Sequence, residues 1–441
     1  MSTPNRLYFG DCLDVMREFI PDESVDVIYA YPPFNSKRIY NANMGGAQWV
    51  AFKDTWQWHE AVDDFHEVAS RNDMAPTMEG LRTILGEGSD LAYLSYMANR
   101  LLECFRVLKP TGTMFLHCDP TMNYLLRIVL NAIYSSHKDS FLNEIVWYYK
   151  TGGVSKRWLS RKHDTIFLFA KSKHHQFYPQ KEKSYLAHKY GFKNIEILED
   201  HGGAYTMVNM RDVWDIPALR GNQKEHQGFE TQKPASLLQR VIKLSTQENQ
   251  LVLDPFCGCG TTLQAAQELD RRWIGIDICT KACQVIEKRF KESFDSVWDD
   301  VEFIGMPKTV SQAHEMASID PFRFETWAAS LAPGMEANKK QRGDRGIDGW
   351  GRIPLRKGYF ADMVSQVKGG HTNPGHVQAF NGARQQAGAD MGIFTCFEDR
   401  VTNGMRNAAA STGRFMDVPT IQIYTIEDFF ANRLPQLPRA A

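Results

Sequence analysis

The chain has 441 residues, of which 43% are hydrophobic and 23% charged, a composition typical of a soluble chain of two or three domains. It contains no run of about 18 apolar residues and no signal peptide, which excludes a membrane protein and predicts a cytoplasmic location. The formal net charge of −1 neither favours nor excludes a nucleic acid as partner, so local charge patches must decide.

Residues 6–34 predict a strand, a short helix and a strongly apolar strand over 25–30 that runs into Pro32 and Pro33. Because proline restricts the backbone around it, residues 31–34 should form a rigid loop at the carboxyl end of that strand. Ligands of open α/β sheets bind at this edge. Residues 40–90 form an aromatic-rich insertion that is either a lid or a helical subdomain.

From residue 91 onward, helices and strands alternate as far as the two apolar strands expected over 141–150 and 163–171. This alternation predicts a parallel sheet with helices on both faces. The short gap between the last two strands allows one antiparallel pair at the edge of the sheet.

Basic residues gather between 150 and 193, where the only acidic residues are Asp164 and Glu182. Aromatic side chains such as Trp158 are interleaved with them. An excess of one charge sign with stacking surface favours contact with phosphates over an ordinary solvated surface. The residues predicted to contact the phosphates of a nucleic acid are Lys156, Arg157, Arg161 and Lys162.

Residues 251–278 predict a strand, a turn with Gly258 and Gly260, a helix and a second strand that ends at Asp277. Such a turn lets a ligand approach the backbone, and Asp277 is placed to accept hydrogen bonds from a ribose. The glycine spacing is that of neither a dinucleotide fingerprint nor a phosphate loop, which favours a nucleoside ligand. Four cysteines between 257 and 283 make zinc a weaker alternative to buried thiols, because they lack CxxC spacing.

The series TQKP (231–234), DPFCGCGTT (254–262) and IGID (274–277) resembles the amino-methyltransferases that act on exocyclic nitrogens of DNA bases, in their permuted order with the catalytic motif N-terminal. The resemblance implies S-adenosyl-L-methionine as cofactor, flipping of the target base, and target recognition by residues 172–230. The cofactor-binding residues that it implies are Asp11, Lys233, Pro234, Asp254, Phe256, Gly258, Gly260, Thr261 and Asp277.

In this family the loop at 31–34 has Asp, Asn or Ser, then Pro-Pro and an aromatic residue, and it holds the target base. Pro32, Pro33 and Phe34 match this pattern and are, with position 31, the implied catalytic residues. Tyr31 departs from it, because a phenol is bulkier than the short acceptor and accepts hydrogen bonds only weakly near neutral pH. Tyr31 marks either a natural degenerate site or an inactivating substitution, and the otherwise intact motif favours the second.

The α/β rhythm stops after Phe290, and a linker is expected over 301–320. Beyond it the sequence predicts a helix with Glu325, a Gly-rich turn around Asp348, and a strand on which Gln366 and Lys368 share a face. Asp348 and Gln366 would bind Mg²⁺, with a further carboxylate from Glu325, and Lys368 would orient the attacking water.

This pattern resembles the Mrr-like branch of the PD-(D/E)xK nucleases. Gln366 stands where the wider superfamily has a carboxylate. The alternative is a small α/β domain in which Asp348 only caps a turn.

The sequence thus predicts a Rossmann-like methyltransferase domain over residues 1–300, with helices on both faces of a sheet that has one antiparallel strand, and a smaller restriction-endonuclease-like α/β domain over 321–441. The expected function is a bifunctional restriction-modification enzyme that methylates adenine N6 and cuts DNA with Mg²⁺. The alternatives are a cytosine N4 methyltransferase, a DNA-binding nuclease whose S-adenosylmethionine pocket is an effector site, and an RNA methyltransferase, which nothing in the sequence favours. Double-stranded DNA is the expected partner, and a homodimer is one option for the assembly.

Overall fold

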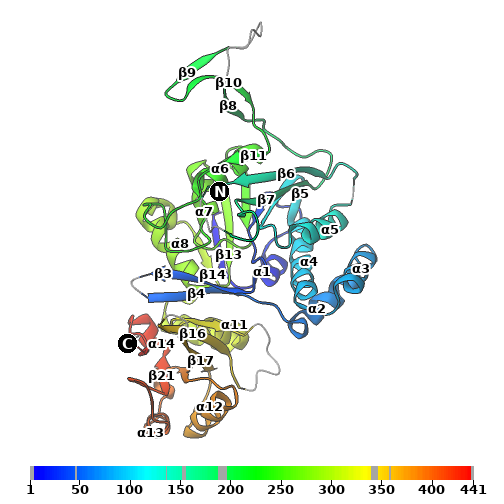
Figure 1. Ribbon diagram of the computed structural model, residues 1–441. Helices are drawn as coiled ribbons and strands as arrows, with labels where there is room; N and C mark the ends of the chain where they lie inside the picture. The colour runs from blue at the N-terminus through cyan, green and yellow to red at the C-terminus, as the bar shows by residue number, and fades with distance from the viewer. Residues whose placement is uncertain are drawn as a thin grey trace.

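The computed structural model of the protein describes residues 4–44, 47–135, 137–150, 155–186, 196–338, 346–356 and 359–438, without the side chains of 38–53, 354 and 356. A large α/β unit carries a slender three-stranded sheet at one end and a smaller α/β unit at the other (Figure 1). Within the described ranges, every helix is too short or too polar to cross a lipid bilayer.

The large unit is built on a nine-stranded sheet in the order β11-β6-β7-β5-β2-β12-β13-β1-β14. Its strands are β1 (Arg6–Phe9), β2 (Val25–Ala30), β5 (Leu108–Cys118), β6 (Phe141–Tyr148), β7 (His163–Ala170), β11 (Val213–Asp215), β12 (Leu251–Asp254), β13 (Arg272–Asp277) and β14 (Glu302–Ile304). All neighbours are parallel except β7, which runs antiparallel to both β5 and β6. The expected antiparallel pairing therefore lies inside the sheet and not at its edge, because β11 adds a further strand beyond β6.

Helices cover both faces of this sheet, as its apolar strands require. Along β2, Val27 and Tyr29 face one apolar cluster, whereas Ile28 and Ala30 face the other. The helices on the first side are α6 (Ala235–Ser245), α7 (Thr261–Glu268) and α8 (Thr280–Ser293), and those on the second are α1 (Cys12–Phe19), α4 (Ser89–Val107) and α5 (Asn123–Ile133). The predicted doubly covered α/β fold is confirmed.

The insertion after the proline loop has two parts. A hairpin of β3 (Arg38–Met44) and β4 (Ala47–Asp54) comes first, followed by α2 (Trp58–Ala69) and α3 (Ala75–Leu85). Phe65, Val68 and Met78 of these helices are buried against α4. The helical-subdomain interpretation therefore holds for residues 58–85, while the hairpin reaches towards the smaller unit, where β4 lies beside β15 and β16 (Figure 1).

The projecting sheet contains β8 (Lys181–Tyr185), β9 (Leu198–Asp200) and β10 (Gly203–Asn209) in the order β8-β10-β9. It belongs to the stretch that the sequence predicts for target recognition. Its side chains are half-buried or exposed, so it has no apolar core of its own.

The stretch expected to be a linker contains β14, which pairs with β1 at the edge of the large sheet, and α10 (Val310–Ile319). A short helix, α9 (Asp295–Trp298), precedes it. Residues 301–320 are thus folded and packed, because Val301, Phe303 and Ala313 all join the apolar core.

The smaller unit has a five-stranded sheet in the order β15-β16-β17-β18-β21. Its strands are β15 (Met335–Ala337), β16 (Gly349–Arg356), β17 (Tyr359–Lys368), β18 (Met391–Cys396) and β21 (Ile421–Thr425). Around it lie the helices α11 (Pro321–Ala329), α12 (Pro374–Gln386), α13 (Asn403–Ala410) and α14 (Ile426–Phe430), the 3-10 helix η1 (Glu398–Arg400) and the two short strands β19 (Arg414–Phe415) and β20 (Val418–Pro419).

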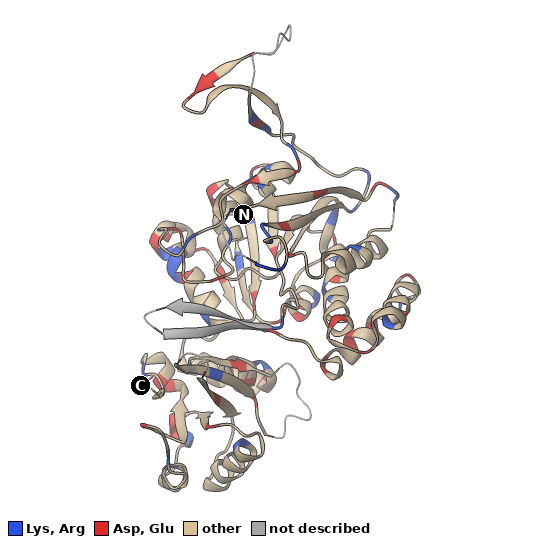
Figure 2. Ribbon diagram, viewed as in Figure 1, with Lys and Arg blue, Asp and Glu red and all other residues tan. Residues whose placement is uncertain are grey.

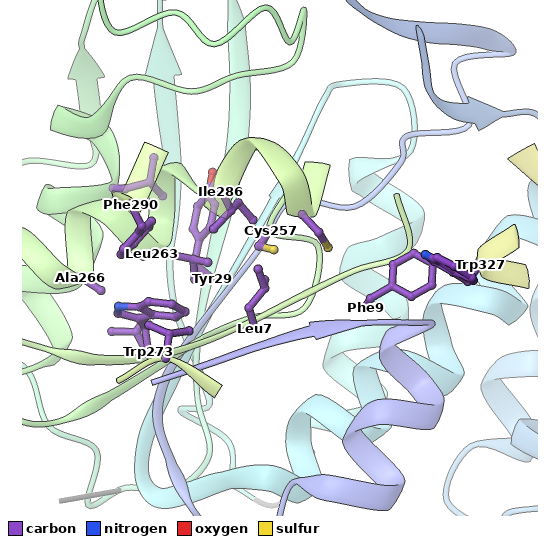
Figure 3. Close-up of a cluster of buried hydrophobic side chains, with 14 of the residues drawn as sticks. Leu7, Phe9, Tyr29, Cys257, Leu263, Ala266, Trp273, Ile286, Phe290 and Trp327 are labelled. Atoms are coloured by element: carbon purple, nitrogen blue, oxygen red, sulfur yellow. The ribbon is translucent and has the colours of Figure 1, made fainter. Parts of the chain in front are cut away.

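One apolar cluster joins the two units. Trp327 of α11 is fully buried and belongs to the same apolar cluster as Phe9 of β1 (Figure 3). The Thr280 hydroxyl, at the start of α8, contacts the Ser330 hydroxyl just after α11. The smaller unit is therefore packed directly against the element that follows Asp277.

Candidate functional site

A cavity opens at the carboxyl ends of β1, β2, β12 and β13. This is the sheet edge at which open α/β folds bind ligands. The predicted site residues that line it are Asp11, Tyr31, Pro33, Lys233, Asp254, Phe256, Gly258, Thr261 and Asp277. Pro32 and Phe34 are buried behind the cavity wall, and Pro234 caps α6.

The turn between β12 and α7 is held from both sides by carboxylates. Asp277 accepts the backbone N–H groups of Gly258, at 2.7 Å, and of Cys279, at 2.8 Å. Burial raises the pKa of Asp277 to about 6. Asp254 accepts the Phe256 N–H at 3.0 Å, and burial raises the pKa of Asp254 to about 7.

The two glycines of this turn are needed for different reasons. Gly258 has φ +51° and Gly260 has φ +77°, a backbone region that favours glycine. A Cβ on Gly260 would lie 2.7 Å from Cγ1 of Ile286 in α8, so this glycine allows close packing within the protein. A Cβ on Gly258 would meet nothing within 4 Å, and it is this residue that presents bare backbone to the cavity.

Asp11 is a helix cap as well as a cavity residue. Its carboxylate accepts the Leu13 N–H at 2.8 Å at the start of α1. It also forms an ion pair of 2.6 Å with Arg100, whose guanidinium lies 3.3 Å from the Tyr96 ring centroid. Asp11 therefore caps α1 and lines the cavity at the same time.

The proline loop is fixed by Asp54, which is fully buried at the end of β4. Its carboxylate accepts the backbone N–H groups of Phe34 (3.1 Å), Asn35 (2.7 Å) and Ser36 (2.8 Å), and also the Trp56 indole N–H (3.1 Å). Hydrogen bonds to a charged acceptor are stronger than neutral ones. Residues 34–36 are thereby pinned to the insertion.

The Tyr31 ring fills the space in front of this loop. Its centroid lies 4.7 Å from that of Phe34 and 4.6 Å from that of His117, both in edge-on contacts. The Lys233 ammonium lies 3.5 Å from the Tyr31 ring centroid. Tyr31 is therefore held on several sides by Phe34, His117 and Lys233.

A buried polar chain lies behind Tyr31. His117 Nδ1 is 2.7 Å from the Tyr29 hydroxyl, and His117 Nε2 is 3.1 Å from Asp164, which also accepts the Tyr149 hydroxyl at 2.9 Å. Burial lowers the pKa of His117 to about 4. Burial opposes ionisation of Asp164 as well, but its hydrogen bond with His117 keeps the Asp164 pKa below its ordinary value.

The smaller unit places Asp348 and Gln366 on neighbouring segments of a hairpin, as the sequence predicts. Asp348 accepts the Val367 N–H at 2.6 Å, and the Gln366 amide donates to the Gly346 carbonyl at 2.9 Å. Glu325 lies on α11 and Lys368 ends β17, both half-buried. In the described ranges, no three His, Cys, Asp or Glu side chains gather to hold a metal ion.

The basic stretch divides in two. In β8, Lys183 pairs with Asp200, while Glu182 pairs with Arg211, so this part carries both signs. Figure 2 shows acidic and basic residues interspersed in the same way over the surface helices of the large unit. The loop at 155–162 differs, because Lys156, Arg157 and Arg161 are exposed there beside Trp158 and Leu159, which are 67% and 93% exposed.

The family model described as "DNA methylase" matches residues 25–288, more than half of the chain, so this protein belongs to the DNA methylase family. A second model, "NACHT-associated inactive Restriction Endonuclease 1", matches residues 323–430.

Curated relatives include the type II methyltransferase M.BamHI of Bacillus amyloliquefaciens, 29% identical over 65% of this chain and 57% of its own length. Another is M.BglII of Bacillus subtilis, 28% identical over 62% of this chain and 65% of its own length. The chain thus spans about three fifths of these relatives. Among solved structures, the PvuII DNA methyltransferase (cytosine-N4-specific) aligns over 68% of this chain and 95% of its own, with 15% identity and a TM-score of 0.41.

Asp54, His117, Asp164 and Arg100 were not predicted as site residues. Asp54 lies in an insertion without regular periodicity, so nothing in the sequence links it to residues 34–36. His117 could have been selected from the sequence as a candidate site residue, because it is a lone ionisable side chain in the apolar strand 113–118.

Replacing Asp54 by Ala should leave the four N–H donors that it binds without their acceptor. Since hydrogen bonds to charged groups are worth about 1.5–3 kcal/mol each, we expect a loss of about 3 kcal/mol or more in the free energy of unfolding. Chemical denaturation measures it, and Glu248→Ala, at an exposed carboxylate, is the control. Equal stabilities of the two variants would contradict the role of Asp54.

Asp254 should make stability depend on pH. Its pKa is about 7 when folded and about 4 when unfolded, so the folded state binds the proton more tightly and the free energy of unfolding falls as pH rises from about 4 to 7. Asp254→Asn removes this titration. The variant should gain stability relative to the parent across that range and show a constant difference above it, as measured by denaturation at several pH values; a difference independent of pH would contradict the assignment.

Proposed function

We propose that residues 1–300 form an S-adenosylmethionine-dependent DNA amino-methyltransferase whose target is adenine N6 and whose transfer step is suppressed by Tyr31. Membership of the DNA methylase family and the resemblance to type II methyltransferases support the reaction class. The adenine target rests on the motif resemblance, with cytosine N4 as the alternative. The observation that carries the suppression is the packing of Tyr31 among Phe34, His117 and Lys233.

The cavity fits a nucleoside cofactor. Gly258 offers bare backbone in open space, and each Asp277 oxygen accepts one protein N–H, which leaves acceptor capacity for ribose hydroxyls. Phe256 supplies an apolar wall. When bound, S-adenosylmethionine would supply the electrophilic methyl group; the protein would hold the ribose at Asp277 and the adenine end between Phe256 and the β1 edge.

The loop at 31–34 would orient the target amine. The Pro33 carbonyl accepts the Tyr93 hydroxyl at 2.7 Å, which fixes the loop. Since Pro33 lines the cavity, the second lone pair of its carbonyl would receive the amine. The short acceptor that would complete the site is replaced by a phenol. Loss of one positioned transition-state hydrogen bond typically costs a factor of about 10² to 10³ in rate.

The exposed loop at 155–162 is the best candidate for DNA contact. Its lysine and arginine residues would meet phosphates, and Trp158 offers a stacking face. Double-stranded DNA therefore remains the proposed substrate, and the alternative of a DNA-binding protein that uses the cofactor only as an effector shares this surface. Methyl transfer by the Tyr31→Asp variant would distinguish a methyltransferase from a protein that uses the cofactor only as an effector.

For the smaller unit, we propose a restriction-endonuclease-like fold that does not cut. The described residues do not fit a divalent cation, because no three His, Cys, Asp or Glu side chains gather among them and Gln366 offers a neutral amide where a second carboxylate would stand. Hard cations such as Mg²⁺ need several oxygen ligands, usually including carboxylates. The similarity to a family described as inactive agrees with this proposal.

Tyr31→Asp should bring methyl transfer to duplex DNA up from a low or undetectable level by about 10²-fold, because it restores a short charged acceptor. Tyr31→Phe is the matched control and should gain nothing. Single-turnover transfer of labelled methyl groups measures both. Efficient transfer by the unaltered chain would show that Tyr31 does not suppress the reaction.

The unaltered chain should not cleave duplex DNA when Mg²⁺ or Mn²⁺ is added. Asp348→Ala should instead lower the free energy of unfolding by about 1–3 kcal/mol, because the Val367 N–H loses its acceptor, whereas Asp348→Asn should lose less. Gel assays of cleavage and denaturation curves test the two statements. Metal-dependent cleavage that disappears in both Asp348→Ala and Lys368→Ala would contradict this proposal and support a nuclease function for the smaller unit.

A further inference from the structure

The motif lysine Lys233 is in an unusual setting. It precedes α6 and lines the cavity, where its ammonium donates to the Thr231 carbonyl at 3.1 Å. Within the described part of the chain no carboxylate forms an ion pair with it. Its neighbours are instead aromatic: the Tyr31 ring centroid at 3.5 Å and the Trp147 ring centroid at 5.6 Å.

The charged and titratable groups around Lys233 come from three elements. Asp164 of β7 and Asp119, just after β5, favour its ammonium form at longer range, whereas Cys259 of the β12–α7 turn would do so only as a thiolate, and burial raises the pKa of that thiol. His117 of β5 is neutral at pH 7, since its pKa is about 4. These groups do not offset burial, which lowers the pKa of Lys233 to about 8.

Position 31 is where a counter-charge would fit. Tyr31 follows β2 and Lys233 precedes α6, and the two meet at the carboxyl edge of the sheet although they are 202 residues apart. A shorter acid at position 31 would place its carboxylate near the inner edge of the present ring, facing the ammonium. An aromatic face attracts a cation as well, but only through its quadrupole.

We propose that Lys233 is a positioning residue for position 31. Its ammonium would pair with a carboxylate at that position. In this chain the ammonium instead makes a cation–π contact with Tyr31, which keeps the target-base pocket closed. Lys233 thereby belongs to the base-binding loop and not to the cofactor. The effect of Lys233 on the target-base pocket rests on the proposed function, but the pairing of Lys233 with residue 31 can be tested without methyl transfer.

The first test is the titration of Lys233. Protein labelled with ¹³C at lysine Cε gives one resonance for it, assigned by its absence from Lys233→Met. We expect a pKa near 8 in the unaltered chain and the same value within about half a unit in Tyr31→Phe, which keeps the ring. In Tyr31→Asp the pKa should rise by at least about one unit, because an opposite charge within contact distance favours the ammonium.

Equal Lys233 pKa values in Tyr31→Phe and Tyr31→Asp, with both proteins folded by circular dichroism, would overturn the pairing. This readout does not depend on whether Tyr31→Asp transfers methyl groups. If the Lys233 pKa rises in Tyr31→Asp but no methyl transfer appears, the pairing is supported and the proposed function is contradicted. If methyl transfer appears but the Lys233 pKa does not rise, the proposed function is supported and the pairing is contradicted.

The second test separates a positioning role from cofactor binding. In the Tyr31→Asp background, Lys233→Met should lower single-turnover transfer by about 10-fold or more and leave the calorimetric affinity for S-adenosylmethionine within about threefold. Lys243→Met, at an exposed lysine near the end of α6, is the matched control and should change neither. A loss of affinity for S-adenosylmethionine with an unchanged transfer rate would show that Lys233 binds the cofactor and does not position residue 31.

Discussion

The site depends on a single buried carboxylate. Asp54 binds the backbone N–H groups of three consecutive residues, 34 to 36, and so decides where the proline loop stands relative to the end of β2. Proline stiffens the loop but provides no N–H donor at positions 32 and 33, so the fixing contacts must come from the residues that follow. Beside the loop fixed in this way, the Tyr31 ring packs against Phe34, His117 and Lys233.

The cofactor turn is anchored by a second carboxylate, and that anchor connects the two units. Asp277 holds Gly258 and Cys279, and the next residue, Thr280, contacts Ser330 after α11. The apolar cluster that contains Cys257 and Ile286 behind this turn also contains Trp327. The smaller unit is therefore part of the wall that supports the cavity, which is a structural role that it can fill without cutting DNA.

Much of this architecture could be predicted from local patterns. The turn around Gly258, the Pro-Pro loop and the Asp348–Gln366 hairpin each lie within a short stretch whose periodicity and turn residues determine the local structure. The position of Asp54 could not be predicted, since its partners in the proline loop lie 18 to 20 residues away and no spacing rule connects a hairpin end to a loop. The contact of Lys233 with Tyr31 is equally invisible in the sequence, because it depends on which strands are neighbours in the sheet. The interior antiparallel β7 and the folded segment at 301–320 were missed because β11 and β14 are only three residues long and carry little pattern.

The central claim is that an intact cofactor pocket stands beside a closed target-base pocket. Calorimetric titration of S-adenosylmethionine into the unaltered chain and into Tyr31→Asp tests it most directly. The account predicts that both proteins bind the cofactor with affinities within about tenfold of each other, because Asp277 and Gly258, and not residue 31, are proposed to contact the ribose. Absence of binding in the unaltered chain, or binding that appears only in Tyr31→Asp, would contradict it.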